Sequence, residues 1–231
     1  MKEGQQVKSI QRYYISNRFL IGLSVLLFTA LGALSIGINC RAVHEYDLNM
    51  AAFVQSFEST GLTGVMKVVT AIGSVKLAVL LGLIAGGLLY FGLGLRIEVL
   101  FLFSVLGGAA IWNQILKYLI QRERPIIHLL VEEKGYSFPS GHTMGALALY
   151  GAITFLFWGH LTSRAGRILL VIFNCLLVAM IGISRVYLGA HFPSDIIGAL
   201  LASGLWLTIM IQCFQWYKKS QIGPTHKMLQ I

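Results

Sequence analysis

The chain has 231 residues, of which 56% are hydrophobic and only 12% are charged. This length suits a single domain, and the low charged share excludes an ordinary soluble globular protein, in which about 25% of residues are charged. The formal net charge of +9 could indicate nucleic-acid binding. However, the basic residues stand as scattered pairs and form no stripe with interleaved aromatic residues, so the pattern argues against that class.

Six stretches free of Asp, Glu, Lys and Arg are long enough to cross a bilayer, since a helix needs about 20 apolar residues to span the hydrocarbon layer. They are residues 19–40, 77–95, 99–116, 143–163, 168–184 and 196–217, and we expect the second to begin near Val68. The predicted fold class is therefore an all-α integral membrane protein, a six-transmembrane-helix bundle. We expect a polar lead at 1–18, one domain at 19–217 and a basic tail at 218–231.

A shorter helical pattern follows the first span. Residues 47–57 carry apolar side chains at loosely helical spacing, namely Leu48, Ala51, Ala52, Val54 and Phe57. An amphipathic helix of this kind lies flat at a membrane surface. We therefore expect a short amphipathic segment on the outer surface of the membrane.

The basic residues also predict the orientation of the chain, because Lys and Arg favour the cytoplasmic side of a membrane. With the N-terminus inside, the cytoplasmic basic residues are Lys2, Lys8, Arg12, Arg18, Arg96, Arg164, Arg167, Lys218, Lys219 and Lys227. We expect a multi-pass protein of the cell membrane (plasma or inner membrane) with both termini in the cytoplasm. The first apolar run is longer than that of a signal peptide, so it reads as an uncleaved anchor. The connections 117–141 and 184–195 then share the outer face.

Two cations mark the end of the third span. Lys117 and Arg124 flank the sequence Tyr-Leu-Ile-Gln-Arg-Glu, and Pro125 follows. Proline disfavours helical geometry in the residue before it, so we expect the helix to stop at Arg124 with Lys117 about two turns back. This pair could bind an anion, although snorkelling of basic side chains at a membrane boundary would give the same pattern.

The second segment is Phe138-Pro139-Ser140-Gly141-His142, just before the fourth span. Ser140 is a favourable N-cap, and the free backbone N–H groups of a first helical turn attract anions. We expect His142, in the first helical turn, to face the same anion site. A simple turn entering a helix is the competing interpretation.

The third segment runs from Ser184-Arg185 to His191 and Asp195, between the fifth and sixth spans. If this turn is helical, Asp195 lies on the same face as His191 and can fix its tautomer, which leaves the other ring nitrogen bare. A boundary salt bridge would also place these two residues four apart.

Together, the three segments predict a phosphate site on the outer face. The cations and backbone N–H groups would hold the nonbridging oxygens, as phosphoryl transfer requires. His191 would attack phosphorus to give a phosphohistidine, and His142 would protonate the leaving oxygen and later deprotonate water. No metal-ligand spacing such as His-Glu-x-x-His is present, so we expect neither metal nor cofactor.

These segments resemble the signatures of the PAP2 (type-2 phosphatidic acid phosphatase) superfamily, which read Lys-x6-Arg-Pro, Pro-Ser-Gly-His and Ser-Arg-x5-His-x3-Asp. The match in residues, order and spacing is complete, and the resemblance spans about residues 45–215. The string from Thr70 to Ser74 is also similar to the start of the family's second helix.

The resemblance implies a role for each residue. The phosphate-binding residues would be Lys117, Arg124, Ser140, Gly141 and Arg185. The catalytic residues would be His191 as nucleophile, His142 as acid and base, and Asp195 as the partner that orients His191. Members of the family include phosphatidylglycerophosphate phosphatases, undecaprenyl diphosphate phosphatases and lipid phosphate phosphatases, with the site at the outer face.

We therefore expect an enzyme that hydrolyses a lipid phosphate monoester or diphosphate without a metal. Its substrate would be phosphatidylglycerophosphate, undecaprenyl diphosphate or phosphatidic acid, and the compact chain favours the first two. Two alternatives stay open: a lipid phosphotransferase that uses the same site, and a non-enzymatic anion or lipid transporter. The sequence predicts a lipid partner within the bilayer and names no protein partner.

Overall fold

The structure is a computed structural model that describes residues 14–125 and 128–221. Most of the predicted polar lead (1–18) and basic tail (218–231) lies outside these described residues. The predicted domain limits at residues 19 and 217 therefore stay predictions. Within the described part of the chain, every element is helical, as the all-α fold class predicts.

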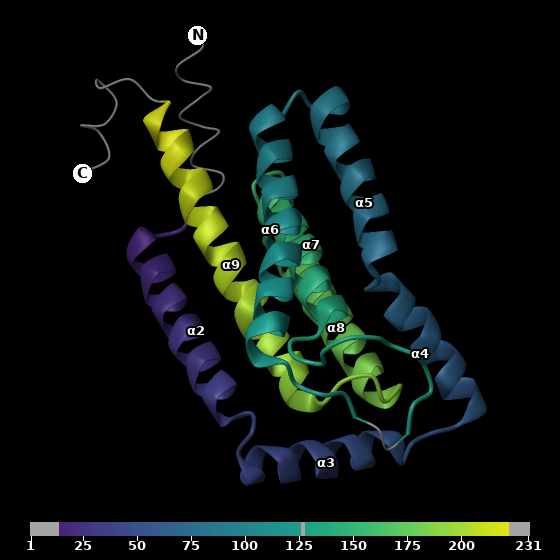
Figure 1. The fold of residues 1–231 in the computed structure, drawn as a ribbon. Helices are drawn as coiled ribbons and strands as arrows, with labels where there is room; N and C mark the ends of the chain where they lie inside the picture. Colours follow the sequence, from purple (N-terminus) through teal and green to yellow (C-terminus); the bar gives the residue numbers. More distant parts are fainter. Residues whose placement is uncertain (1–13, 126–127, 222–231) are drawn as a thin grey trace.

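The helices form a bundle with one helix laid across an end (Figure 1). In chain order they are α2 (Asn17–Gly37), α3 (Arg41–Gln55), α4 (Thr60–Ile72), α5 (Val75–Gly87), the π-helix η1 (Leu88–Gly92), α6 (Arg96–Ile120), α7 (Gly141–Trp158), α8 (Arg164–Tyr187) and α9 (Pro193–Ser220). The crossing helix is α3, so we call that end of the bundle the α3 end. The long loop between α6 and α7 and the turn between α8 and α9 both lie there (Figure 1).

Five of the described segments are long and apolar enough to cross a membrane. They are Asn17–Gly37, Val75–Gly92, Arg96–Ile120, Arg164–Tyr187 and Pro193–Ser220. The multi-pass membrane architecture is thus confirmed, but the count of six spans stays a prediction. The helix outside this group that corresponds to the predicted fourth span is α7, whose first turn carries the polar residues His142 and Thr143.

The second predicted span is not one continuous helix from near Val68 to residue 95, and this expectation was wrong. The helix α4 ends at Ile72, and Ser74 starts α5 by accepting a hydrogen bond from Leu77 N at 3.3 Å. A Cβ on Gly73 would lie only 2.4 Å from the side chain of Ile181 on α8. The chain therefore bends where α4 passes closely over α8.

The core of the bundle forms around α7, which packs against α6, α8 and α9. Its small residues Ala148 and Ala152 are fully buried and let the neighbouring helices approach. Near the opposite end of the bundle, Phe101, Phe155 and Phe214 pack with ring centroids 5.0–5.7 Å apart. This packing fixes the N-termini of α7 and α9 and the C-terminus of α8 at the α3 end.

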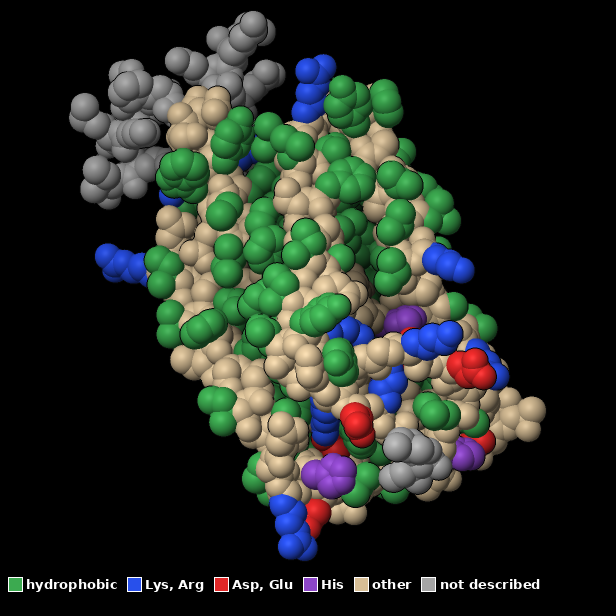
Figure 2. All heavy atoms as spheres, viewed as in Figure 1, with side chains coloured by type: hydrophobic (Ala, Val, Ile, Leu, Met, Phe, Trp, Pro, Cys, Tyr) green, Lys and Arg blue, Asp and Glu red, His purple; other side chains and the backbone are tan. Residues whose placement is uncertain are grey.

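Charge divides between the two ends of the bundle. The basic residues at the end opposite α3 are Arg18, Arg96, Arg164, Arg167, Lys218 and Lys219. Glu98 is the one acidic residue of the described chain at that end, where it is buried and paired with Lys218 at 2.9 Å. On the face shown in Figure 2, acidic and histidine side chains gather at the α3 end, and apolar side chains cover the middle.

Candidate active site

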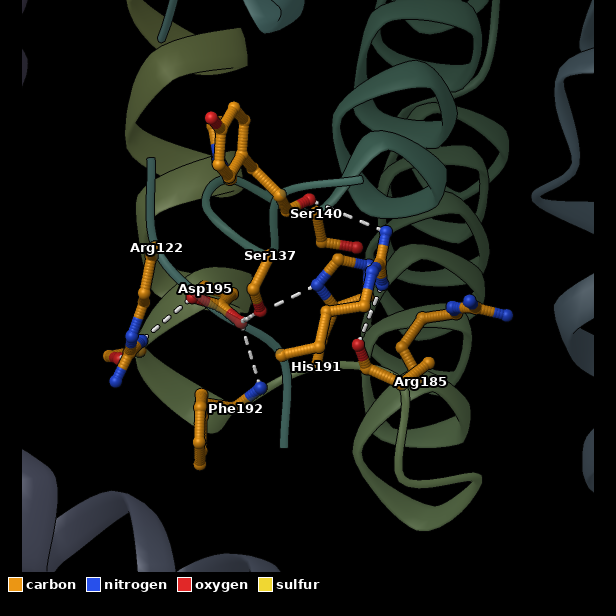
Figure 3. Close-up of polar contacts among 12 residues, drawn as sticks. Arg122, Ser137, Ser140, Arg185, His191, Phe192 and Asp195 are labelled. Atoms are coloured by element: carbon orange, nitrogen blue, oxygen red, sulfur yellow. Dashed lines mark hydrogen bonds and ion pairs between the residues drawn. The ribbon is translucent and has the colours of Figure 1, made fainter. Parts of the chain in front are cut away.

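The three sequence segments meet at the α3 end of the bundle (Figure 3). The last turn of α6 brings Lys117, and the loop after it brings Arg124. The start of α7 brings the Ser140 to His142 turn, and the α8–α9 connection brings His191. All eight residues predicted for the site lie in this region. Their catalytic roles stay predictions.

The turn between α8 and α9 depends on Gly189. Its φ is +73°, a left-handed conformation that glycine adopts without strain. A Cβ there would also lie 2.0 Å from the backbone oxygen of His128. Leu130 N donates to Leu188 O at 3.1 Å, which ties the α6–α7 loop to this turn. Gly189 thus lets the two loops that carry the site pack backbone against backbone.

His191 and Asp195 meet, although not through the single helical turn that we expected. The helix α9 begins at Pro193, so His191 lies outside it, and Asp195 accepts a hydrogen bond from Phe192 N at 2.8 Å. His191 Nδ1 lies 3.4 Å from Asp195 Oδ2, close to this carboxylate but outside hydrogen-bond geometry. Catalytic hydrogen bonds are often long or poorly aligned without substrate and tighten when it binds. Ser137 Oγ also donates to Asp195 Oδ2.

The other ring nitrogen of His191 faces a cation. Arg124 Nη1 lies 3.3 Å from His191 Nε2. Because a guanidinium only donates hydrogen bonds, we assign Nε2 as the bare nitrogen and place the ring proton on Nδ1, toward Asp195. Burial lowers the pKa of His191 below its ordinary value, and Asp195 opposes this shift only in part. The ring is therefore neutral at pH 7, and the lone pair of Nε2 faces Arg124.

Arg185 is buried, with 2% of its surface exposed. Its Nη1 donates to Thr70 Oγ1 at 2.8 Å, and its Nη2 binds the Glu133 carboxylate. Its Nε is buried and has no partner among the described residues. An unsatisfied donor in a buried cationic group is costly, so this atom favours an incoming acceptor.

Lys117 and Arg124 bind loop carbonyls, and the helix between them ends earlier than we expected. The helix α6 stops at Ile120 because Gln121 turns into the left-handed region at φ 50°, so Arg124 lies in the loop. Arg124 Nε donates to Gly135 O at 2.9 Å, and Lys117 Nζ donates to Tyr136 O at 2.8 Å. The expected helix end at Arg124 was therefore wrong.

Glu133 lies among the predicted phosphate-binding cations, and the sequence analysis missed it. Its carboxylate pairs with Arg185 and lies 4.0 Å from Arg124. Burial raises the pKa of Glu133, but the charge and hydrogen bond of Arg185, together with the charges of His142 and Arg124, outweigh this effect and the net shift is downward. Glu133 is thus an ionised group held where an anion is expected. In sequence it looks like any acidic loop residue.

Side chains of α6 and α7 hold the turn from Ser140 to His142 in place. Ser140 occupies the predicted N-cap position, but its hydroxyl accepts from Thr143 Oγ1 at 3.2 Å and caps no backbone N–H. Asn113 on α6 donates to Pro139 O at 3.1 Å. The first N–H groups of α7 therefore have no side-chain cap, as expected of an anion site.

His142 belongs to the same electrostatic cluster. The charges of Arg185, Glu133 and Arg124 act on its ring, as does His191. No hydrogen bond holds the His142 ring among the described residues, so the ring can serve a bound group. Residues 14–125 and 128–221 contain no group of three or more His, Cys, Asp or Glu that could hold a metal ion.

The arrangement can perform nucleophilic displacement at an anionic centre. A neutral His191 presents a lone pair beside Arg124, and Arg185 supplies a second permanent cation. Such cations stabilise the charge on the equatorial oxygens of a transferring phosphoryl group. The same cluster offers His142 for proton transfer.

Comparisons with known proteins identify the family of the chain. The sequence model of the PAP2 superfamily matches residues 98–219. The chain is 32% identical over 192 residues to phosphatidylglycerophosphatase B of Bacillus subtilis, which covers 82% of this chain and 93% of that protein. It is also 30% identical over 145 residues to undecaprenyl-diphosphatase of Sulfolobus acidocaldarius, with 60% of this chain and 61% of that protein covered.

A solved structure shares the fold. The crystal structure of a transmembrane PAP2-type phosphatidylglycerolphosphate phosphatase from Bacillus subtilis superposes with a TM-score of 0.78 at 30% sequence identity. The match covers 84% of this chain and 96% of that chain. The similarity therefore extends over nearly the whole bundle.

Proposed function

The chain belongs to the PAP2 superfamily, and from this premise we propose that it is a membrane lipid phosphatase that hydrolyses a phosphate monoester or diphosphate through a phosphohistidine on His191. The observation that carries the proposal is the bare Nε2 of His191, fixed between Asp195 and Arg124. This nitrogen belongs to a ring whose other nitrogen faces a carboxylate, and it lies beside a permanent cation.

The chemistry proceeds in two steps. His191 Nε2 forms a bond to phosphorus while the bond from phosphorus to the lipid oxygen breaks, and His142 gives its proton to that leaving oxygen. Water then attacks the phosphohistidine, His142 takes the water proton, and the nitrogen–phosphorus bond breaks to release inorganic phosphate. One histidine thus serves first as acid and then as base.

The phosphate takes the place of Glu133. A substrate phosphate carries more charge than a carboxylate and offers more acceptor oxygens, so Arg185 and Arg124 exchange one anion for the other. Lys117 and the backbone N–H group of Gly141 complete the set of donors, whereas Ser140 N already donates to Asp195 O at 3.2 Å. The unpartnered Nε of Arg185 supports this assignment, because it gains an acceptor only when a ligand arrives.

Phosphatidylglycerophosphate is our first candidate substrate. The support is the similarity to a phosphatase of this name over 82% of the chain. Undecaprenyl diphosphate and phosphatidic acid are the competing substrates, and the first of these is named by a more partial match. Each offers a terminal phosphate on a lipid anchor.

We place the α3 end at the outer face of the cell membrane, with both termini in the cytoplasm and α7 as the sixth span. The cluster of basic residues at the opposite end supports this orientation, because such residues favour the cytoplasmic side. The apolar exposed residues of α3, including Phe53 at 58% exposure, suit a helix that lies against the membrane surface.

Phosphate release tests the function directly. Purified protein in detergent is given phosphatidylglycerophosphate, undecaprenyl diphosphate and phosphatidic acid, with and without EDTA. We expect release from at least one lipid, unaffected by EDTA, and an acid-labile label on the enzyme that His191→Ala abolishes. Label that appears on a second lipid would indicate transfer instead, and folded protein that releases no phosphate would overturn the proposal.

Native cysteines test the orientation. Cys40 is exposed near the α3 end, and Thr162 lies in the exposed loop at the opposite end. In a background that carries Cys175→Ser and Cys213→Ser, a membrane-impermeant maleimide should label Cys40 in intact cells. After Cys40→Ser, a Thr162→Cys variant should label only in broken cells. The reverse pattern would place the site in the cytoplasm.

A further inference from the structure

A buried arginine joins Asp195 to a helix that the mechanism does not use. Arg122 is 8% exposed and follows the end of α6. Its Nη1 donates to Asp195 Oδ1 at 2.7 Å, and its Nη2 donates to Asp47 Oδ2 at 2.6 Å. In Figure 3, Arg122 approaches Asp195 from the side away from His191. The carboxylate is therefore held between the arginine and the proposed nucleophile.

Asp47 is the buried residue of α3, with none of its surface exposed. Its Oδ1 accepts from Ser194 N at 2.9 Å, and its Oδ2 accepts from Ser194 Oγ at 2.6 Å. Ser194 precedes Asp195 in the first turn of α9. Asp47 thus ties the crossing helix α3 to the turn that carries the catalytic carboxylate.

Arg122 controls both oxygens of Asp195. Besides the direct bond to Oδ1, its backbone oxygen accepts from Ser137 N at 2.8 Å, and the Ser137 hydroxyl donates to Oδ2. The guanidinium carbon also lies 4.3 Å from the centre of the Phe192 ring. With both oxygens held, the orientation of the carboxylate toward His191 is fixed.

The charges of this group do not cancel. A guanidinium paired with Asp195 alone would neutralise the carboxylate, but Arg122 divides its charge between Asp195 and Asp47. Two carboxylates and one arginine leave one net negative charge beside His191. Buried charges interact strongly because little water screens them. This excess negative charge stabilises the positive ring that forms when Nε2 binds phosphorus.

We infer that Arg122 and Asp47 are positioning residues of the reaction. Arg122 aligns Asp195 toward His191. Asp47 shares the charge of Arg122, so Arg122 does not neutralise Asp195 and the negative charge of Asp195 acts on the His191 ring. The inference rests on the proposed phosphatase function. Arg122 bonds directly to Asp195, and Asp47 bonds to Arg122 and Ser194, so both act on His191 through Asp195.

The pH at which His191 titrates measures the electrostatic effect that Arg122 and Asp47 exert on its ring through Asp195. The charged and titratable groups that face its ring are Asp195 from α9, Arg124 from the loop, Arg185 from α8 and His142 from α7. Neither Asp47 nor Arg122 is one of these groups, so substituting either leaves all four of them present in the chain. A shift in the titration of His191 in such variants therefore reflects the change in charge on the far side of Asp195.

Two substitutions shift the titration in opposite directions. Asp47→Asn removes a negative charge, so His191 loses its proton more easily and the acid limb of kcat/KM moves to lower pH. Arg122→Gln removes a positive charge and moves that limb to higher pH. The double variant restores the net charge and returns the limb near its wild-type position. We expect kcat to fall between about tenfold and about a hundredfold in all three, since alignment is lost, with little change in KM.

Glu98→Gln is the matched control, because it also removes a carboxylate from a buried ion pair, at the opposite end of the bundle. It should leave kcat and the pH profile unchanged. The double variant covers the case in which a single substitution fails to fold, because it leaves no carboxylate or arginine unpaired on the Asp47 side. A structural role alone would lower stability without shifts of opposite sign.

NMR titration of labelled histidine separates this inference from the proposed function. We expect the His191 signal to titrate at lower pH in Asp47→Asn and at higher pH in Arg122→Gln. Wild-type protein that releases no phosphate but shows these shifts would overturn the function and retain the charge link. An active wild type whose His191 titration and kcat are unchanged in folded Asp47→Asn would overturn the inference.

Discussion

Arg124 Nη1 lies 3.3 Å from His191 Nε2, on the side of the ring opposite Asp195. Arginine cannot accept the bond, so this contact determines which nitrogen is bare. Arg124 also donates to Ala190 O at 2.8 Å, which fixes the guanidinium next to the ring. The residue proposed to bind phosphate therefore lies directly against the lone pair of the proposed nucleophile.

Asp195→Asn tests the orientation of His191. The amide can present its NH₂ group toward Nδ1, which favours the wrong tautomer and places the proton on Nε2. We expect kcat to fall by at least about a hundredfold with KM within about twofold of wild type. Steady-state phosphate release measures both. A variant with wild-type kcat would show that Asp195 does not orient the nucleophile.

The acid side of the pH profile follows from the lowered pKa of His191. Because burial disfavours the charged ring, His191 stays neutral below its ordinary value of about 6.5. The enzyme should keep its kcat/KM as the pH falls through 6.5 and lose activity at lower pH, where His191 takes up a proton. An acid limb centred above pH 6.5 would contradict this prediction.

Glu133→Gln tests whether the carboxylate competes with phosphate. Without its charge, Arg185 and Arg124 are free for another anion, so vanadate should inhibit more strongly, with an inhibition constant lowered about tenfold, as expected for a change of about 1.4 kcal/mol in binding. The neighbouring exposed residue offers the control Glu132→Gln, which should leave inhibition unchanged. Weaker inhibition in Glu133→Gln would mean that Glu133 organises the cations and does not block them.

Gly189→Ala tests the loop contact beneath His191. Gly189 and Gly135 both have left-handed backbones, with φ of +73° and +78°. Only at Gly189 would a Cβ meet backbone, 2.0 Å from His128 O, whereas the space beside Gly135 is open. We expect Gly135→Ala to cost about 1 kcal/mol of stability, and Gly189→Ala to lower the thermal midpoint far more and abolish activity. Equal midpoints in the two variants would contradict the contact.

Several features could be predicted from local sequence. Hydropathy predicted the membrane-spanning helices to within a few residues, because each depends on its own apolar run. The turn at Ser140 and the grouping of Lys117, Arg185 and His191 followed from short motifs at span ends. The errors are helix ends that hydropathy does not show: the second span is interrupted at Gly73, which packs closely against Ile181 on α8, and α6 ends early at the left-handed Gln121.

The sequence by itself determined that the chain is an all-helical membrane protein with its histidines and cations gathered at span ends, because burial in lipid and helix termini are local properties. Only the tertiary structure decided which charges pair. Asp47 and Asp195 both meet Arg122, from positions 75 and 73 residues away in the chain. Contacts at such separations depend on how helices pack, so no local pattern distinguishes these residues, or Glu133, from ordinary charged residues at a surface.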